Sequence, residues 1–492
     1  MAKRSLLIIL GAFLVSVAVR VPQLDRPLSA HHEYCTAFTL IALTNWYEDG
    51  FATHHGVPSG GFVRQAEPLF PPDKFSRNER AIGTYYFSHP PLAYDLPYLL
   101  FSIFGTAPNV TGLQLFNLFF HLITTIALFF VLRSVFSESS VSPAPLFAAL
   151  LYLFMPAPLW FHGNAYMSDL FVQNMWVLHL VFAIRVFQQK EAPSTSLLLR
   201  FGLTLFLTVY TSWLGVFAAA TAVGIALWQW RTSTNRRTLL LLGVSVAAVV
   251  LTIGLSAFRY LQVVDASALI QHFTDRFAVR GSFAMPDGPL PHLKQMVINY
   301  RMGFLPVLIA LGILLFVRVR RAHLFHEMNA PRLWLFVALT GIPVLLDHAF
   351  LLQYADHDFS ALKAGPLLCG LSGIGISVFP KRWATVAIGA TCLAGVLYFY
   401  KINPVGEKAD ERYAQEMELG SKIGKETSPD DVVFAIDLSA EPQVVWYAHR
   451  NIIRVGTIQQ AEEFIRERGL QEGVVFQREG EGTDVHRIRP AN

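Results

Sequence analysis

The sequence is short of charged residues for a chain of its length. Asp, Glu, Lys and Arg make up 15% of the 492 residues, whereas soluble globular proteins carry roughly 25%. Hydrophobic residues make up 53%, and the mean hydropathy is +0.41. Because a charged side chain at the centre of a bilayer is costly, this deficit predicts a chain whose middle part lies in lipid.

The sequence also has few cysteines and no recognisable nucleotide-binding motif. The three cysteines are Cys35, Cys369 and Cys392, and the last two lie in apolar runs, so we expect no disulfide framework. The absence of a CxxC pair excludes a zinc-finger type of site, and no P-loop or Rossmann motif occurs. A net charge of +4 is too small for the dense basic patch of a nucleic-acid-binding protein.

Long apolar runs, in contrast, are frequent. A transmembrane helix needs about 20 mostly apolar residues, and about eleven runs qualify as candidate spans. They are 5–21, 111–133, 144–161, 169–187, 198–212, 215–230, 238–256, 302–318, 332–350, 362–379 and 384–400. The first run follows Lys3 and Arg4, and a cleaved signal peptide is an alternative interpretation for it. Because many apolar runs follow, we favour a retained first helix.

Basic residues alternate along the connections between these runs. They occur at every second connection, as expected for cytoplasmic loops. These residues are Lys3, Arg4, Arg133, Arg185, Lys190, Arg200, Arg231, Arg236, Arg237, Arg318, Arg320, Arg321, Arg332, Lys381 and Arg382. The pattern predicts a multi-pass protein of the plasma (inner) membrane with a cytoplasmic N-terminus. The connections 22–110, 162–168, 213–214, 257–301 and 351–361 and the C-terminal tail are then extracytoplasmic.

Two segments require separate interpretation. Pro91 to Gly105 is too short to span and contains Asp95 and Pro97, so we expect a helix that lies on the outer membrane surface. From Lys401 onward, charges are dense and short β-type runs alternate with polar helical segments, which predicts a small α/β domain. The predicted fold is therefore an all-α polytopic membrane domain, residues 1–400, followed by a soluble extracytoplasmic domain, residues 401–492.

Two carboxylates stand at the starts of predicted helices on the outer side. Glu33 lies in the first turn of a predicted surface helix, where a carboxylate can accept a proton from an acceptor hydroxyl. Its alternative role is to stabilise the helix dipole. Asp169 begins a span at the outer surface and is either a catalytic or binding residue or a helix cap, for which Ser168 competes.

Further candidates gather on the same predicted side. His89 opens the surface helix and is a candidate for binding phosphate or a sugar hydroxyl, with a structural role as the alternative. His357 and Asp358 precede the span that contains Lys363, which either pairs with Asp358 or receives an anionic phosphate. Basic residues of the connection 257–301 are candidates for contact with a lipid-linked phosphate or with ordinary headgroups. They are Arg259, Arg276, Arg280, His292, Lys294 and Arg301.

Adjacent histidines suggest a metal site, but their spacing does not support one. His31–His32 and His54–His55 each project to different faces of a helix, and no HExxH motif occurs. We therefore expect no cofactor and no metal-ligating residues, although a divalent metal stays open as an alternative.

The order of these motifs resembles the GT-C superfamily of polyprenyl-phosphate-sugar glycosyltransferases, of the protein O-mannosyltransferase and aminoarabinose-transferase type (glycosyltransferase families 39 and 83). The matching elements are an acidic motif after the first span, a His-Pro-Pro-Leu motif opening a helix that ends in Phe-Gly, an Asp at the fourth span, a His-Asp-aromatic motif before a late span, and an outer C-terminal domain. In this sequence the motifs are His32-Glu33, His89 to Leu92 with Phe104-Gly105, Asp169, and His357-Asp358-Phe359.

The resemblance implies transfer of one sugar from a polyprenyl phosphate to a lipid, glycan or protein acceptor on the extracytoplasmic face, with inversion and a carboxylate base. Arg, Lys or His would stabilise the leaving phosphate. The family commonly has Asp-Glu where this chain has His32-Glu33, so Glu33 or His32 would take the role of the base. A second departure is Ser88-His89, which stands where the aminoarabinose transferases have an acidic-basic pair.

Two other classes of function remain as alternatives. A transporter or flippase of lipid-linked glycans would place ionisable residues in mid-span and show inverted repeats. Most mid-span positions of this sequence are apolar and no repeat is evident, which favours the enzyme. A multi-span scaffold whose work is done by the C-terminal domain is the third class.

Overall fold

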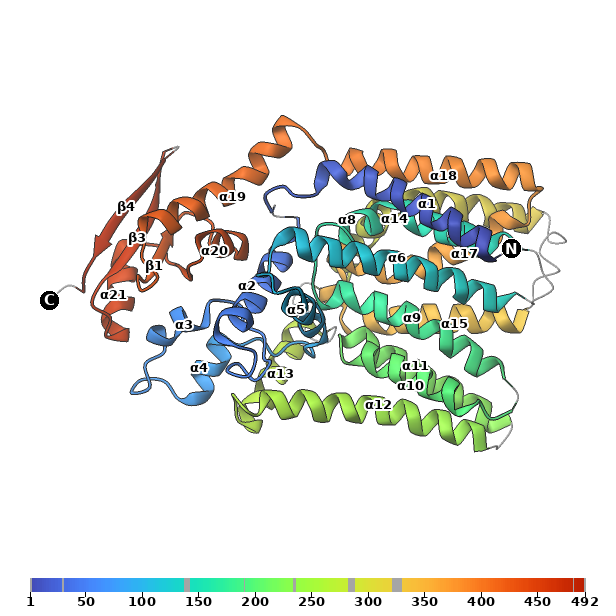
Figure 1. Ribbon diagram of the computed structural model, residues 1–492, viewed down its shortest axis with the longest axis horizontal. Coiled ribbons are helices and arrows are strands. Elements are labelled where there is room, and N and C mark those ends of the chain that lie inside the picture. The colour runs from blue at the N-terminus through green and yellow to red at the C-terminus, as the bar shows by residue number, and fades with distance from the viewer. Residues whose placement is uncertain are drawn as a thin grey trace.

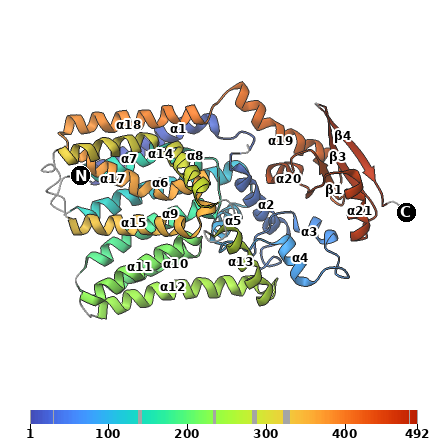
Figure 2. The ribbon, with the colours of Figure 1, turned by 180° about the vertical axis from the view of Figure 1, so that it is seen from behind.

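A bundle of long helices carries a smaller domain at one end (Figure 1). The computed structural model describes residues 2–28, 31–136, 142–189, 191–232, 236–281, 288–320, 330–480 and 482–490. The N-terminus lies at the end of the bundle remote from the small domain, and the C-terminus lies in that domain (Figures 1 and 2). We call the two ends of the bundle the domain end and the far end.

In the described part of the chain, the bundle consists of twelve helices, two of which are short. They are α1 (Ala2–Arg20), α6 (Val110–Val135), α7 (Ala144–Phe154), α8 (Pro156–Phe161), α9 (Ser168–Gln188), α10 (Thr195–Val209), α11 (Trp213–Thr232), α12 (Arg236–Tyr260), α14 (Leu290–Arg320), α15 (Ala330–Phe350), α17 (Gly365–Ser377) and α18 (Lys381–Ile402). Within the described ranges, nine helical segments are long and apolar enough to cross a membrane. The predicted fold of a polytopic helical membrane protein is confirmed.

One predicted span and one predicted connection differ from the observed helices. The run 144–161 is divided at Met155, which is extended because Pro156 disfavours a helical conformation in the preceding residue. The connection 257–301 was predicted to be a loop, and this prediction is wrong for most of its length. It contains α13 (Ala266–Arg280) and the first turns of α14, which is kinked at Phe304, two residues before Pro306.

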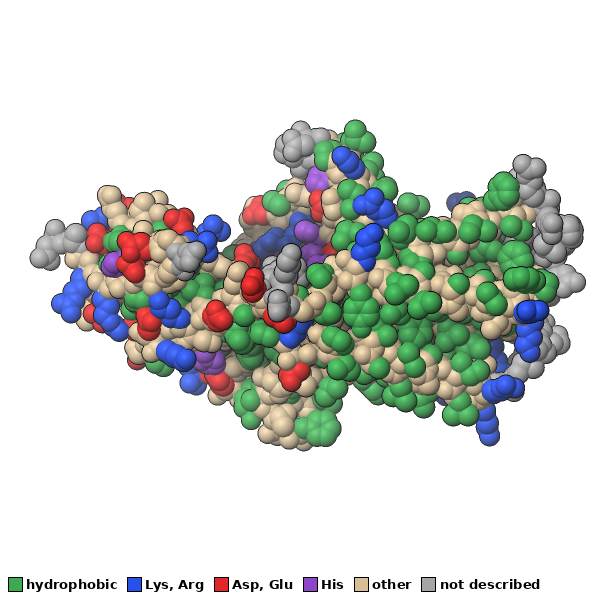
Figure 3. All heavy atoms as spheres, turned by 90° about the horizontal axis from the view of Figure 1, so that it is seen from above, with side chains coloured by type: hydrophobic (Ala, Val, Ile, Leu, Met, Phe, Trp, Pro, Cys, Tyr) green, Lys and Arg blue, Asp and Glu red, His purple; other side chains and the backbone are tan. Residues whose placement is uncertain are grey.

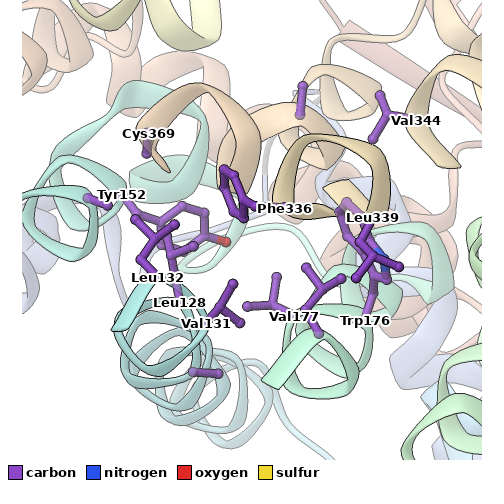
Figure 4. Close-up of a cluster of buried hydrophobic side chains, with 14 of the residues drawn as sticks. Leu128, Val131, Leu132, Tyr152, Trp176, Val177, Phe336, Leu339, Val344 and Cys369 are labelled. Atoms are coloured by element: carbon purple, nitrogen blue, oxygen red, sulfur yellow. The ribbon is translucent and has the colours of Figure 1, made fainter. Parts of the chain in front are cut away.

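Close packing of side chains holds the bundle together. Leu128, Val131 and Leu132 of α6 face Trp176 and Val177 of α9 across a cluster that α7, α15 and α17 complete (Figure 4). Because lipid tails are as apolar as these side chains, packing contacts rather than removal from water stabilise such helix pairs.

Glycines allow the closest helix contacts. A Cβ atom at Gly373 of α17 would lie 2.6 Å from the backbone nitrogen of Ala148 in α7, and one at Gly395 of α18 would lie 2.2 Å from the carbonyl oxygen of Phe154. No larger residue fits at either position without moving a backbone. Small residues at membrane helix interfaces permit this approach.

Short helices lie between the bundle and the small domain (Figures 1 and 2). They are α2 (Glu33–Asp49), α3 (Val63–Ala66), α4 (Arg77–Thr84), α5 (Leu92–Phe104), α13, α16 (Leu352–Ala355) and the 3-10 turns Val21–Gln23, Glu67–Leu69 and η4 (Asp358–Ala364). At about 1.5 Å per residue, α5 is about 20 Å long, which is short of a hydrocarbon core of about 30 Å. It lies at the domain end, where Asp95 accepts two hydrogen bonds from Arg259, of 2.9 and 2.8 Å.

The C-terminal domain is built on a mixed sheet. Its elements are α19 (Glu407–Glu426), β1 (Val433–Ile436), α20 (Pro442–Ala448), β2 (Ile452–Arg454), α21 (Ile458–Arg468), β3 (Gly473–Glu479) and β4 (Gly482–Ile488). The strand order is β2-β1-β3-β4, in which β1 pairs parallel with β2 and β3, and β4 pairs antiparallel with β3. The predicted α/β domain is confirmed, although β4, a mostly exposed edge strand rich in polar residues, was not predicted.

The C-terminal domain contacts the residue that precedes α3 and the segment that precedes α2. The side chain of Asn451 accepts from the backbone nitrogen of Phe62 at 2.8 Å and donates to its carbonyl oxygen at 2.7 Å. The guanidinium of Arg26 lies 3.7 Å from the ring centroid of Tyr413 in α19. These contacts fix the domain over the end of the bundle where the candidate residues lie.

One acidic side chain at this interface should make stability depend on pH. The pKa of Glu416 is raised to about 7, first by burial and then by the charges of Glu441 and Glu33, and its Oε2 has no hydrogen-bond partner among the described residues. The unfolded value is about 4.3. The stabilising contribution of the protonated group is therefore fully present below about pH 4 and is lost as the pH rises through about 7.

We expect the midpoint temperature of thermal unfolding of the full chain to fall between about pH 5 and about pH 8. Glu416→Gln should flatten this dependence and raise the midpoint at the higher pH, because the amide carries no charge. Glu418→Gln, at an exposed position of the same helix, is the matched control and should keep the slope of the unmodified protein. An unchanged slope in Glu416→Gln would show that another group titrates.

Candidate active site

Asp169 is the centre of a buried polar cluster at the domain end. It is the second residue of α9, and 2% of its surface is exposed. Ser212, between α10 and α11, donates to Oδ1 at 2.6 Å, and Tyr354 of α16 donates to Oδ2. His89 Nε2 lies 3.2 Å from Oδ2. The alternative role of Asp169 as a helix cap is not observed, because its carboxylate contacts side chains of other elements instead.

Lys363 joins this cluster from the 3-10 turn η4. Its Nζ donates to Asp347 Oδ2 at 2.7 Å and lies 4.0 Å from Asp169 Oδ1. The expected alternative of pairing with Asp358 is not observed, since the 3-10 geometry of η4 directs Lys363 toward α9 and α15. Lys363 is 1% exposed and held between two carboxylates, so it is poorly placed to receive a phosphate.

His31 and His32 enclose Asp358 in a second, more accessible cluster. His31 Nε2 lies 2.7 Å from Oδ2 of Asp358, and His32 Nε2 lies 2.6 Å from Oδ1. The exposed fractions of these side chains are 26%, 17% and 15% for His31, His32 and Asp358. His32 Nδ1 is buried and has no hydrogen-bond partner among the described residues. A histidine whose one nitrogen faces a carboxylate can accept a proton at the other.

The backbone of His32 supports a functional interpretation of this cluster. His32 precedes α2 in the left-handed conformation, with φ 56° and ψ 8°. This conformation costs a residue with a Cβ about 1–2 kcal/mol. Such outliers cluster at active sites and ligand-binding segments. The strained position directs the ring of His32 toward Asp358 and Phe359, whose ring centroid is 5.2 Å away.

Tyr354 connects the two clusters, and Arg280 covers it. The Tyr354 ring lies 5.4 Å from the rings of both His357 and Phe359, while its hydroxyl reaches Asp169. Burial, and next the charge of Asp169, raises the pKa of Tyr354, so this hydroxyl stays a donor. The guanidinium of Arg280, the last residue of α13, lies 5.0 Å from the centroid of the Tyr354 ring.

Arg280 is the cation at this site that no described carboxylate neutralises. It forms neither an ion pair nor a hydrogen bond with any residue in the described part of the chain. Its charge opposes the effect of burial on the pKa of Tyr34 and Tyr86, which burial raises. Burial lowers the pKa of His357, and Arg280 lowers it further. The charge of Arg280 therefore acts on the pKa of groups from three separate segments of the chain.

Glu33 lies in a different environment. It is 1% exposed, and its Oε2 accepts from Arg26 at 3.0 Å. Arg26 in turn contacts Tyr413 of the C-terminal domain, so Glu33 belongs to the contact that holds that domain. The loop before α9 is tied to the first turns of α2, because Thr36 Oγ1 donates to the carbonyl oxygen of Asn164 at 2.8 Å.

The remaining predicted residues lie around these clusters. Arg259 forms an ion pair with Asp95. Arg276 is exposed on α13, one turn before Arg280. His357 is 44% exposed, and its ring stacks on Phe359 with centroids 5.3 Å apart. Figure 3 shows a hollow between the C-terminal domain and the bundle in which acidic, basic and histidine side chains gather.

Sequence reasoning missed three residues of the site. Ser212, Asp347 and Tyr354 were not singled out as site residues, whereas Arg280 was among the basic residues considered for phosphate contact. Asp347 carried a signal, because a carboxylate inside a predicted span requires a partner. The described residues contain no group of three or more His, Cys, Asp or Glu side chains arranged to hold a metal ion.

Comparisons place the chain within a known fold. No family model and no curated protein sequence matches it. The structure of ArnT from Cupriavidus metallidurans bound to undecaprenyl phosphate is 13% identical in sequence, covers 97% of this chain and 92% of its own, and superposes with a TM-score of 0.58. The archaeal oligosaccharyltransferase AglB from Archaeoglobus fulgidus, in complex with an inhibitory peptide and a dolichol-phosphate, is 13% identical, covers 96% of this chain and 69% of its own, and has a TM-score of 0.55. The resemblance to GT-C proteins is thereby confirmed at the level of the fold.

Proposed function

We propose that this protein is a membrane glycosyltransferase that moves a single sugar from a polyprenyl phosphate to a hydroxyl group of a lipid, glycan or protein acceptor. One observation carries the proposal. An unpaired guanidinium, Arg280, shares the domain end of a membrane bundle with a partly exposed His-Asp group. The shared fold with two proteins whose structures contain polyprenyl-type phosphates supports the same donor class.

The reaction divides between the two groups. The acceptor oxygen gives its proton to His32 Nδ1, while Asp358 orients the ring and stabilises the imidazolium. The oxygen attacks the anomeric carbon from the face opposite the phosphate, so the new glycosidic bond forms as the bond to the phosphate oxygen breaks, with inversion. The polyprenyl phosphate leaves with an additional negative charge, which Arg280 stabilises.

The Asp169 cluster supports this reaction by holding other parts of the site in place. Asp169 contacts His89, Ser212, Tyr354 and Lys363, and these come from separate elements at the domain end. We assign Asp169, His89 and Lys363 to holding Tyr354 and η4 in place, rather than to contact with the sugar. Glu33 positions Arg26 and the C-terminal domain, and it is the competing candidate for the base.

The side of the membrane follows from charge. The basic residues of the far end belong to short connections, and proteins place such residues in the cytoplasm. The domain end, with the clusters of Asp169 and Asp358, is then extracytoplasmic, as is the C-terminal domain. A cytoplasm-dependent reporter fused after Asn492 should therefore stay inactive, whereas strong reporter activity would reverse the orientation.

The test is transfer of radiolabelled sugar from a polyprenyl-phosphate donor by the full-length protein in membranes. Arg280→Gln should raise the KM for the donor by about 10- to 100-fold, because a hydrogen bond to a charged group contributes about 1.5–3 kcal/mol. Arg276→Gln should have a smaller effect, since that side chain is exposed one turn away.

Lys294→Gln, an exposed cation of α14, is the control and should keep the KM of the unmodified protein. If Arg280→Gln behaves like this control, Arg280 does not bind the donor phosphate. If no transfer occurs with any polyprenyl-phosphate sugar while labelled lipid-linked glycan crosses the membrane, the protein is a transporter instead.

A further inference from the structure

A large cavity opens at the far end of the bundle, remote from the candidate active site. Its volume is about 1220 Å³. Residues from α1, α6, α7, α9, α10, α15, α17 and α18, with the segments that flank them, line it. Each of these elements begins or ends at this end of the bundle (Figures 1 and 2).

Among the described residues, the charged side chains that line the cavity are all basic. Arg133 of α6, Arg185 of α9, Arg332 of α15 and Lys381 of α18 line it, and no Asp or Glu of the described ranges does. Arg133, Arg185 and Lys381 form no ion pair with a described carboxylate, and Arg332 donates to the carbonyl oxygen of Phe136 at 3.4 Å. The preference for basic residues in cytoplasmic loops accounts for cations at this end. It does not require that cations from four separate helices converge on one cavity.

Hydrogen-bond donors and apolar rings complete the lining. The donors are Ser5, Ser134, Ser142, Ser377, Gln188 and Gln189, and the apolar residues include Phe129, Phe130, Phe136, Leu146, Leu197 and Phe379. A cavity of this size exceeds what an inorganic phosphate fills, and its apolar walls give no advantage to a small anion. An amphiphile with an anionic head and an apolar part matches both kinds of lining.

We propose that this cavity binds the anionic headgroup of a phospholipid. The phosphate neutralises Arg133, Arg185 and Lys381, and the upper part of the acyl chains contacts the phenylalanine rings. Basic pockets between transmembrane helices bind anionic headgroups in this way. The bound lipid links the ends of α6, α9 and α18, whose cations would otherwise repel one another. This site goes beyond the proposed sugar transfer, since none of its residues belongs to the candidate active site.

Native mass spectrometry of the full-length protein, titrated with phosphatidylglycerol, tests the proposal. The triple variant Arg133→Gln, Arg185→Gln, Lys381→Gln should weaken binding by about 100-fold, because each basic residue near a lipid headgroup contributes about a five- to tenfold gain in affinity. The matched control, Arg4→Gln, Arg200→Gln, Arg382→Gln, removes the same charge from exposed positions of the same end that do not line the cavity. It should bind as the unmodified protein does.

Two further measurements make the result decisive. Phosphatidylcholine should bind weakly to all proteins, and inorganic phosphate in large excess should not displace phosphatidylglycerol. Equal losses in both triple variants would show diffuse surface attraction and overturn the proposal, as would displacement by phosphate, which would indicate a site for free anions. If the first triple variant does not fold, Arg133→Gln alone, compared with Arg4→Gln, gives the same decision.

Discussion

Replacing His32 with alanine is expected to lower the rate of sugar transfer by about 10²–10⁴, the contribution that general-base catalysis commonly makes. His32 Nε2 lies 2.6 Å from Asp358, and Nδ1 has no described partner, so this ring can take the acceptor proton. Asp358→Asn should also be strongly impaired, because the amide cannot stabilise the imidazolium. The measurement is initial rate at saturating donor, with equal amounts of folded protein in the membranes.

The neighbours of His32 provide matched controls. His31 also contacts Asp358, but its ring stacks on Trp160 with centroids 4.6 Å apart, so His31→Ala should lose less activity than His32→Ala. Glu33→Gln removes a charge that holds Arg26 and should act mainly through attachment of the C-terminal domain. A loss in Glu33→Gln that exceeds the loss in His32→Ala, with the domain still attached, would assign the base to Glu33.

Replacing Lys363 with methionine is expected to destabilise the protein by about 3–5 kcal/mol, the cost of breaking a buried ion pair by removing one partner. Lys363 is 1% exposed and stands between Asp347 at 2.7 Å and Asp169 at 4.0 Å. Methionine has similar length and leaves no cavity, so the effect comes from two buried carboxylates without their cation. Thermal unfolding of the purified protein in detergent measures it.

A second substitution separates charge from packing. Asp347→Asn in the Lys363→Met background removes one of the two unneutralised charges, and Asp169 keeps His89, Ser212 and Tyr354 as partners. The double variant should therefore recover part of the lost stability, whereas Asp347→Asn alone should be destabilising. If the two losses add instead, the residues do not act as a pair.

Local properties made much of the fold predictable. Each candidate span falls on helical segments. In lipid, the backbone N–H and C=O groups must form hydrogen bonds within the same segment, which favours a helix. A sufficiently long apolar run therefore predicts a helix. The change to dense charge at Lys401 marks the end of α18 for the same reason. The turns of α13 were missed because its exposed and buried residues are mixed, without a long apolar run.

By itself, the sequence determined which segments are apolar, where the C-terminal domain begins, and which ionisable residues lie near the bundle ends. Only the tertiary structure decided which of them meet. His31 and Asp358 are 327 positions apart, and Lys363 pairs with Asp347 rather than with the nearer Asp358. Arg280, rather than Arg259, is left without a carboxylate, because α5 brings Asp95 to Arg259. Hydrophobic periodicity specifies that a helix forms. The rotation of the helix and its neighbours follow from packing against the whole bundle. This packing determines which partner each charged side chain meets.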